Sequence, residues 1–404
     1  MKAVIIGAGR IGCGLAGELL HASGYELVFV TRTADTAAAL NRFGCYRVIL
    51  TDKHGRREVT VPVACALDAG ATESIIQAIA EAEVIVTAVC AQNLAAIAPL
   101  IAAGLSRRSC PANVLAFENM DNAGPHLRRL VRSAMLVPRD VNLHGFSGAV
   151  ISRMVTQRIA HASGDQPLTF VGDTAPEFVV HGPALRSPLP SIQGMTAVDD
   201  YYPWVLRKLY TFSAGHATAA YLGWLKGYHY IHTAIRDAEI RSAVLTAMSE
   251  GQSGLAARYG SQFAGSKADL EKIIERFENA VINDPVTRVA RDPHRKLGAK
   301  ERLVGAARLA EEAGIFPQQL AMATAAALCF RNAEGRRAGD DAALGHDAAC
   351  VSCVLNQVCG LDSENEFCRK VAISCEELAP SYASGNLLLS LTHPMWSWAV
   401  EQGV

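Results

Sequence analysis

Apolar runs typical of buried β-strands alternate with amphipathic helical patterns in the first half of the chain. Segments with hydrophobic residues three and four positions apart separate the apolar runs, and such alternation predicts a parallel sheet with helices on both faces. The expected strands are Lys2–Ile6, Glu26–Val30, Val84–Val89 and Asn113–Phe117. The expected helices are Gly14–Ala22, Thr36–Phe43, Glu73–Ala80, Leu94–Leu105 and Gly124–Ala134. The fold class is therefore α/β, with an N-terminal doubly wound sheet of the Rossmann type.

The pattern changes twice after Val141. Shorter strand-like runs between Val141 and Val180 are expected to add strands to the same sheet. Residues 184–194 are rich in Pro and Ser and predict a linker. Helical spacing then dominates, in Ala197–Lys226, Tyr230–Tyr259, Ala268–Asn279, Ala299–Ala313, Gln318–Arg331 and Asp341–Leu361. We therefore expect a domain over residues 1–183 and a mostly α-helical domain over 195–404.

Composition excludes several classes of protein. The 404 residues carry a formal charge of −1, which gives no reason to expect nucleic acid or an anionic membrane as a partner. The uncharged stretch Val84–Leu105 is long enough to span a bilayer, but it contains Gln92, Asn93 and Pro99. A buried strand, a turn and a helix explain this stretch better than a membrane span.

The cysteines indicate a reducing compartment. Their number, 11, is odd, and the N-terminus lacks the apolar core of an export signal, so we expect free thiols and a cytoplasmic protein. Cys350 and Cys353, with His346 nearby, have the spacing of half a zinc site. The second ligand pair is missing, which favours cysteines packed in a helix and no metal.

A glycine-rich loop follows the first expected strand. Residues 7–12 match the pattern G-x-G-x-x-G and open a helix, which is the context that a dinucleotide-binding loop requires. The helix N-terminus offers free N–H groups to a pyrophosphate. The residues expected to bind the cofactor here are Gly7, Ala8, Gly9, Arg10, Ile11 and Gly12.

The end of the second expected strand distinguishes the two nicotinamide cofactors. NAD enzymes usually place an acidic residue there to bind the ribose 2′-hydroxyl, and this chain has Thr31, Arg32 and Thr33 instead. A guanidinium and two hydroxyls suit a 2′-phosphate, so the segment favours NADP over NAD. The alternative is that Arg32 is a solvated charge that stacks on the adenine.

One helical segment of the second half concentrates polar side chains on an apolar face. At about 100° per residue, Lys208, Phe212 and His216 fall within an arc of about 80°, with Ser213 at its edge. Burying such groups is unfavourable unless they have a purpose. The spacing alone leaves open a lysine that reaches the surface and a hydrogen-bonded core histidine.

The chain as a whole resembles the polyol-specific long-chain dehydrogenase/reductase family. The motifs that carry this resemblance appear in the family's order from Met1 to about Asp362: GAGRIG at 7–12, FENM at 117–120, KLYTFSAGHATAAYLG at 208–223, IRDAEIRSAV at 235–244, RFEN at 276–279 and RVARDPHRKL at 288–297. The resemblance implies a Rossmann domain before a helical domain, a nicotinamide cofactor and no zinc.

The resemblance also implies roles for single residues. Lys208 corresponds to the family's general base, which takes the alcohol proton, and desolvation eases the loss of a lysine proton. Asn119 corresponds to an amide that polarises the reacting oxygen. His216 corresponds to a residue that positions substrate hydroxyls, and Ser213 stands where the family has an asparagine.

Further matches concern the substrate. Ser152 replaces a family aspartate beside Arg153, and Ser191 replaces another family asparagine, so the resemblance predicts the chemistry more firmly than the substrate. The cationic loop Arg288, Arg291, Arg295 and Lys296 is expected to bind an anionic end of the substrate. From composition alone, this loop reads equally as a solvated run of charges.

We therefore expect an NAD(P)-dependent oxidoreductase that moves a hydride between the nicotinamide and a secondary alcohol or ketone of a polyol or polyol phosphate. The expected partner is a small anionic sugar derivative, and the protein is expected to be a monomer or a small homo-oligomer. Two alternatives stay open. One is an opine-type reductase of a sugar–amino-acid conjugate, and the other is a dinucleotide-binding sensor without catalysis.

Overall fold

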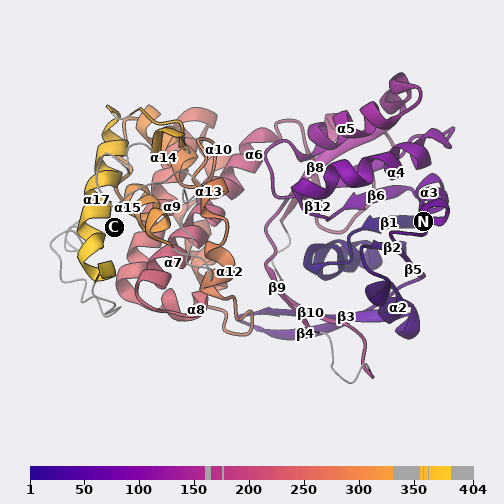
Figure 1. Cartoon of the computed structure of the whole chain (residues 1–404), viewed down its shortest axis with the longest axis horizontal. Coiled ribbons are helices and arrows are strands. Elements are labelled where there is room, and N and C mark those ends of the chain that lie inside the picture. The colour runs from indigo at the N-terminus through magenta and orange to yellow at the C-terminus, as the bar shows by residue number, and fades with distance from the viewer. Residues whose placement is uncertain (160–164, 175–176, 331–354, 358, 363, 384–404) are drawn as a thin grey trace. The chain divides into compact units, whose positions relative to one another are not determined.

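The computed structural model describes residues 1–159, 165–174, 177–330, 355–357, 359–362 and 364–383. The chain forms two compact units, Met1–Tyr201 and Tyr202–Val404 (Figure 1). The first is an α/β unit and the second is helical, so the fold class expected from the sequence is confirmed.

An eight-stranded sheet is the centre of the first unit, with the strand order β12-β11-β8-β7-β6-β1-β2-β5. Every pair from β8 to β5 is parallel, whereas β11 runs antiparallel to β8. The strands are β1 (Lys2–Ile6), β2 (Glu26–Thr31), β5 (Cys65–Asp68), β6 (Val84–Thr87), β7 (Asn113–Ala116), β8 (Gly145–Ile151), β11 (Phe178–His181) and β12 (Met195–Val198).

Both faces of this sheet are buried. Side chains alternate along β1, so that Ala3 and Ile5 join one hydrophobic cluster while Val4 and Ile6 join another. Helices and further strands supply the rest of both clusters, so both faces of the sheet are covered, which explains why the strands are nearly continuous apolar runs. The helices of this unit are α1 (Glu18–Ala22), α2 (Ala34–Phe43), α3 (Thr72–Glu81), α4 (Leu94–Ser106) and α5 (Ala123–Ala134), with shorter helical turns η1 (Gly12–Gly17), η2 (Ala91–Asn93), η3 (Pro138–Leu143) and η4 (Gly182–Ala184).

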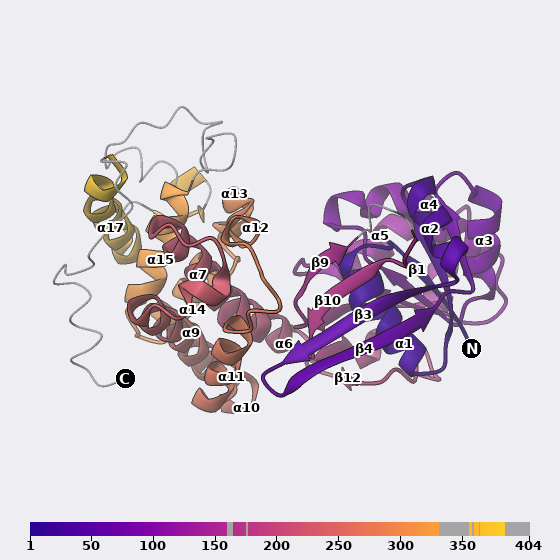
Figure 2. The ribbon, with the colours of Figure 1, turned by 90° about the horizontal axis from the view of Figure 1, so that it is seen from below.

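A second sheet of four strands is absent from the sequence prediction. Its order is β4-β3-β10-β9, and Figure 2 shows its long β3–β4 hairpin in full. The strands are β3 (Cys45–Asp52), β4 (Gly55–Pro62), β9 (Val155–Ile159) and β10 (Thr169–Asp173). The expectation that the runs after Val141 all extend the first sheet is therefore wrong for β9 and β10, which pair with the hairpin instead.

The division between the units follows Tyr201, later than the linker expected at 184–194. Those residues lead into β12, which pairs with β11 and so belongs to the first unit. The stretch Val84–Leu105 contains β6 and most of α4. Among the described residues, no helix is long and apolar enough to cross a membrane.

Helices make up the described part of the second unit. The helix expected from Ala197 begins only at Tyr202, because β12 occupies the preceding residues. The helical segments are α6 (Tyr202–Arg207), η5 (Lys208–Ser213), α7 (Ala214–Leu225), α8 (Ile231–Ala234), α9 (Ala238–Tyr259), α10 (Ser261–Ala264), α11 (Lys267–Phe277), α12 (Val286–Ala290), α13 (Pro293–Lys296), α14 (Val304–Glu312), α15 (Gln318–Cys329) and α17 (Glu366–Ala383). Most of the helix expected over Asp341–Leu361 lies outside the described residues.

Candidate functional site

The glycine-rich loop has the shape that a dinucleotide needs. A Cβ on Gly12 would lie 1.7 Å from the carbonyl oxygen of Gly7, so only glycine fits there. Gly7 has φ +112°, and a Cβ on it would lie 2.4 Å from the carbonyl oxygen of Ala88. A Cβ on Gly9 would meet no described atom within 4 Å, which leaves room for a pyrophosphate against the backbone.

A helix begins within this loop. Arg10 and Ile11 are already helical, Gly12–Gly17 is π-helical, and the Cys13 N–H donates to the Gly9 carbonyl oxygen at 2.9 Å, so the start of the helix lies at the glycines and its first turn suits an anion. The Arg10 side chain is held by the protein itself, because its Nη1 donates a hydrogen bond to the carbonyl oxygen of Thr156 at 2.9 Å. This bond ties the loop to β9. The residues present therefore fit a dinucleotide phosphate.

Arg32 stands apart from its two neighbours after β2. The buried Thr31 hydroxyl donates to the carbonyl oxygen of Thr33 at 2.8 Å, and the Thr33 hydroxyl donates to Thr36 at 2.9 Å. These bonds hold the turn, whereas the Arg32 side chain is exposed. At this turn, therefore, the cation is the group best placed to meet a 2′-phosphate.

The carboxyl ends of β6, β7 and β8 lie at the same edge of the sheet as this loop. Asn119 is exposed just after β7, and Ser152 is buried just after β8. Glu118, which directly precedes Asn119, accepts hydrogen bonds from the Thr87 hydroxyl at 2.7 Å and the Val89 N–H at 2.9 Å. Burial raises the pKa of Glu118 despite these donors. Glu118 was not expected, although an acid at the end of a buried strand is a visible signal.

Two residues expected to contact the substrate, Arg153 and Ser191, are placed differently in the structure. Arg153 is paired within the protein, and Ser191 lies away from the carboxyl edge of the sheet. Arg153 is buried, and its Nη1 lies 2.7 Å from Glu18 Oε2. Ser191 lies beside Tyr25, and the neighbouring Gln193 N–H donates to Ser23 Oγ at 2.8 Å. Since Tyr25 precedes β2, Ser191 is near the amino end of that strand, and the dinucleotide loop is at the carboxyl end. We therefore leave both residues out of the site.

In the second unit, a π-helical segment presents the expected catalytic residues. Lys208 is its first residue and is partly buried, while Ser213 is its last and is buried. The hydrogen-bonded turn is wider here than in an α-helix, so the arc expected at 100° per residue does not apply across it. Such turns occur often at functional sites. His216 follows in the first turn of α7.

His216 is enclosed by aromatic rings and one carboxylate. Its ring is stacked on Phe277 with centroids 4.8 Å apart, and Phe212 lies 5.6 Å away. Nε2 lies 3.1 Å from Asp284 Oδ2. Burial lowers the pKa of His216, against the hydrogen bond and charge of Asp284, so the ring is neutral near pH 7.

Asp284 is the second residue that sequence reasoning missed. It is 3% exposed, and both its oxygens bind Arg288, at 2.5 Å to Nε and 2.6 Å to Nη2. Burial opposes its ionisation, but the hydrogen bonds from His216 and Arg288 outweigh burial and hold its pKa at about 2. The spacing of four residues to Arg288 was the available signal.

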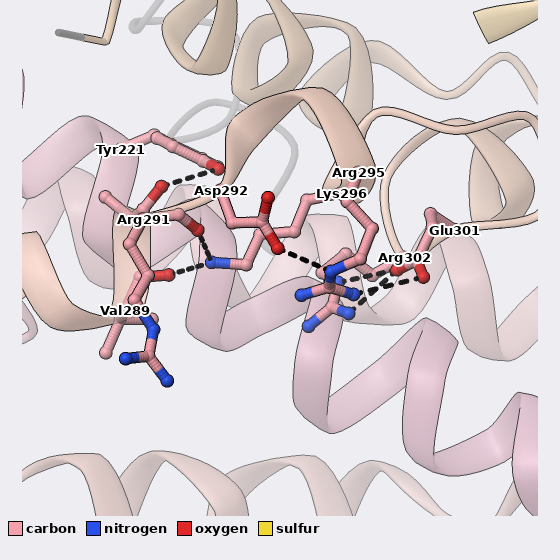
Figure 3. A network of polar contacts seen from close by, with 9 residues as sticks. Tyr221, Val289, Arg291, Asp292, Arg295, Lys296, Glu301 and Arg302 are labelled. Atoms are coloured by element: carbon pink, nitrogen blue, oxygen red, sulfur yellow. Dashed lines mark hydrogen bonds and ion pairs between the residues drawn. The ribbon is translucent and has the colours of Figure 1, made fainter. Parts of the chain in front are cut away.

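Most of the expected cationic loop is bound within the protein (Figure 3). Arg295 pairs with Asp292 at 2.6 Å and with Glu301 at 3.3 Å. Lys296 is buried and donates to the carbonyl oxygens of Val289 and Arg291. Burial, with the charges of Arg302 and Arg295, lowers the pKa of Lys296 to about 7.

Arg291 differs from the other cations of this loop. Its side chain is exposed, and no ion pair joins it to another described residue. Its backbone is fixed, because its carbonyl oxygen accepts from Lys296. Arg291 therefore offers an uncommitted guanidinium on an anchored turn.

The metal alternative has no support among the described residues, which contain no group of three metal-ligating side chains. Cys350, Cys353 and His346 themselves lie outside those residues. Cys13 is buried and forms no disulfide with another described residue, and its backbone carbonyl oxygen accepts a hydrogen bond from the Tyr46 hydroxyl.

Comparison with known proteins gives a consistent result for both units. The family model for the mannitol dehydrogenase Rossmann domain matches residues 1–194, and the model for the mannitol dehydrogenase C-terminal domain matches residues 200–376. Mannitol-1-phosphate 5-dehydrogenase of Bacillus subtilis (strain 168) is 36% identical over 368 residues, covering 90% of this chain and 96% of the relative. The enzyme of the same name from Bacillus velezensis is 37% identical over 369 residues, covering 89% and 96%.

Solved structures share the fold. The ternary complex of Pseudomonas fluorescens mannitol 2-dehydrogenase with NAD and D-mannitol has a TM-score of 0.75 at 17% identity, covering 96% of this chain and 93% of that one. A substrate-free D-sorbitol dehydrogenase has a TM-score of 0.71 at 18% identity, covering 95% and 94%.

Proposed function

This chain belongs to the mannitol dehydrogenase family and is a polyol oxidoreductase, and from that premise we propose that its substrate is a phosphorylated polyol. The reaction moves a hydride between a nicotinamide dinucleotide and the polyol's secondary alcohol or the matching ketone, of the mannitol 1-phosphate and fructose 6-phosphate kind. The names of the relatives support mannitol 1-phosphate as the alcohol, and oxidation at its fifth carbon gives the matching ketone. The observation that carries the proposal is the helical segment that bears both Lys208 and His216, in a unit that also presents Arg291.

The first unit would hold the cofactor. The backbone at Gly7, Gly9 and Gly12 would take the pyrophosphate, because these three residues carry no side chain and the loop leads directly into the start of a helix. Arg32 would pair with a ribose 2′-phosphate, so we propose a preference for NADP over NAD. When bound, the nicotinamide supplies the acceptor or donor of the hydride.

Lys208 would move the proton. In alcohol oxidation, Lys208 Nζ accepts the hydroxyl proton as the C–H hydride departs and the carbonyl bond forms, and in ketone reduction it returns that proton. The amide of Asn119 and the hydroxyl of Ser213 donate hydrogen bonds to the reacting oxygen, where negative charge develops. His216 orients a substrate hydroxyl, and Ser152 borders the substrate.

Arg291 would bind the anionic end of the substrate. Arg288, Arg295 and Lys296 already have partners within the protein, so a phosphate meets the exposed Arg291 with the least rearrangement. A guanidinium binds phosphate through two parallel hydrogen bonds. The cytoplasmic location and the monomeric or small homo-oligomeric state stay predictions.

A substrate panel tests the proposal. The purified chain is assayed with NADPH and NADH against D-fructose 6-phosphate, D-fructose and a fructose–amino-acid conjugate. We expect the phosphate ester to have the highest kcat/KM, about 10- to 100-fold above D-fructose, since a hydrogen bond to a charged group contributes about 1.5–3 kcal/mol. A preference for the conjugate would instead support an opine-type reductase. Cofactor binding without turnover of any of them would support a sensor.

A further inference from the structure

His216 has one ring nitrogen committed to the protein. Nε2 is buried and lies 3.1 Å from Asp284 Oδ2, a close polar contact that is not aligned as a hydrogen bond, and no described residue forms a hydrogen bond with it. An ionised carboxylate can only accept a hydrogen bond, so the proton at this contact belongs to Nε2. In a neutral imidazole, the opposite nitrogen Nδ1 then carries no proton and can only accept.

The carboxylate is itself held in place and charged. Arg288 binds both its oxygens at 2.5 and 2.6 Å from one turn along α12. The backbone fixes the other side, since the Ile231 N–H donates to the Asp284 carbonyl oxygen at 2.9 Å. Asn283, just before it, has φ +46°, a left-handed conformation that asparagine tolerates. These contacts hold the Asp284 carboxylate in place next to His216.

The orientation of the ring is determined by two kinds of contact. Stacking on Phe277, with an interplanar angle of 18°, sets the plane of the imidazole. Stacking does not determine which nitrogen faces which neighbour, because a half-turn about the Cβ–Cγ bond leaves the ring in the same plane. The polar contact with Asp284 makes that choice. The charged groups near the ring are Asp284, Arg288 and Lys296.

We propose that Asp284 is the positioning residue of His216 and holds the ring with its proton on Nε2, so that Nδ1 accepts a hydrogen bond from a substrate hydroxyl. This inference rests on the proposed function for the identity of the hydroxyl group, but the protonation pattern belongs to the free protein. It also assigns Arg288 to Asp284, which leaves the anionic end of the substrate to Arg291.

The protonation pattern is measured first, without substrate. Nitrogen-15 NMR of the full chain labelled at histidine distinguishes the two neutral forms, and the variant His216→Gln identifies the His216 signals. We expect the wild-type ring to carry its proton on Nε2. A proton on Nδ1 in the wild type would overturn the proposal, and this measurement needs no variant at Asp284.

The variant Asp284→Asn tests whether Asp284 determines which nitrogen of His216 carries the proton. Arg288 has only donors, so it takes the amide oxygen and turns the amide N–H₂ toward His216. Nε2 then has to accept, and we expect the proton to move to Nδ1. The variant Asp269→Asn, which changes a partly exposed helix-capping carboxylate in the same unit, should leave the His216 signals unchanged. A proton that stays on Nε2 in Asp284→Asn would contradict the proposal.

Kinetics provide the functional readout. We expect Asp284→Asn to lower kcat/KM for the polyol substrate about 10- to 100-fold, because misplacing a group that positions the substrate can cost about 100-fold in rate, with unchanged affinity for the cofactor. Unchanged kcat/KM in a variant whose proton has moved would overturn the role in substrate positioning. A wild-type protein without turnover would refute the proposed function and leave the NMR result as the test of the pairing.

Discussion

Arg153 Nη1 lies 2.7 Å from Glu18 Oε2 in the interior of the first unit, where the two side chains are only 4% and 5% exposed. The same guanidinium donates to the Gly14 carbonyl oxygen at 3.3 Å. These contacts fasten the helix that follows the dinucleotide loop to the segment between β8 and β9. Arg153 therefore has a structural partner, although the sequence motif suggested a contact with the substrate.

Removing this arginine should destabilise the first unit. In Arg153→Met, Glu18 would keep a buried charge without its close partner, and breaking a buried pair in this way typically lowers the free energy of unfolding by about 3–5 kcal/mol. Hydrogen exchange of peptides from residues 12–22, followed through a urea series, measures the effect.

The control is Arg57→Met. The Arg57 side chain is 68% exposed and lies 3.7 Å from the other carboxylate oxygen of Glu18. That change should lower the free energy of unfolding by about 1 kcal/mol or less. Equal effects of the two variants would contradict the structural role of Arg153.

Arg32 should distinguish the two cofactors. Arg32→Gln removes the cation next to a 2′-phosphate, so NADPH affinity should fall about 10- to 100-fold while NADH affinity changes little. Fluorescence titration of each reduced cofactor measures both constants. Arg42→Gln, an exposed arginine in the last turn of α2, is the matched control. An equal loss for both cofactors would support stacking of Arg32 on the adenine instead.

Arg291 should determine selectivity for a phosphorylated substrate. We expect Arg291→Ala to raise KM for D-fructose 6-phosphate about 10- to 100-fold and to leave the weak turnover of D-fructose unaltered, because only the ester carries the charge. Arg295→Ala should have a smaller effect, since Arg295 is paired with Asp292 and Glu301. The opposite order of the two variants would show that the phosphate binds elsewhere on the loop.

Glu250 should make the stability of the second unit depend on pH. This residue of α9 accepts hydrogen bonds from the N–H groups of Gln319 and Leu320, and burial raises its pKa from 4.5 to about 7 against those donors. Between these values the folded chain holds a proton that the unfolded chain has lost. The stabilisation is thus complete below pH 4.5 and is lost as the pH rises through 7, by on the order of 3 kcal/mol.

The variant Glu250→Gln should abolish this dependence. Urea unfolding followed by tryptophan fluorescence at pH 5 and pH 7.5 reports on the second unit, because all four tryptophans of the chain, Trp204, Trp224, Trp396 and Trp398, belong to it. Relative to the wild type, the variant should lose less stability between the two values. The exposed Glu271→Gln should behave as the wild type does. A variant at Glu250 with the wild-type slope would mean that another group titrates.

The extent to which the sequence predicts this molecule follows from the range of the interactions involved. β1 runs from Lys2 to Ile6 as expected, and the dinucleotide loop has the expected shape, because both depend on a local pattern of apolar residues and glycines. The β3–β4 hairpin was missed, since its polar residues face outward and its partner β10 lies more than a hundred residues later. Its place in the fold depends on that distant pairing.

For the candidate site, too, the sequence predicts local motifs but not long-range contacts. Lys208 and His216 were found from their motif, but the carboxylates of Glu118 and Asp284 were not, because their importance depends on which donors the fold brings to them. The basic loop likewise reads as four similar cations. Only the fold shows that three of them bind within the protein and that Arg291 is exposed.

The central claim is that Lys208 transfers the proton in a hydride-transfer reaction, and the rate of the chemical step in Lys208→Met tests it most directly. With D-fructose 6-phosphate and saturating NADPH in a single turnover, this variant should oxidise the cofactor about 10²- to 10⁴-fold more slowly than the wild type, the usual contribution of a general acid–base group. NADPH affinity should be unchanged, and Lys272→Met, a lysine 71% exposed on α11, should react at the wild-type rate. A single-turnover rate in Lys208→Met equal to that of the wild type would contradict the account.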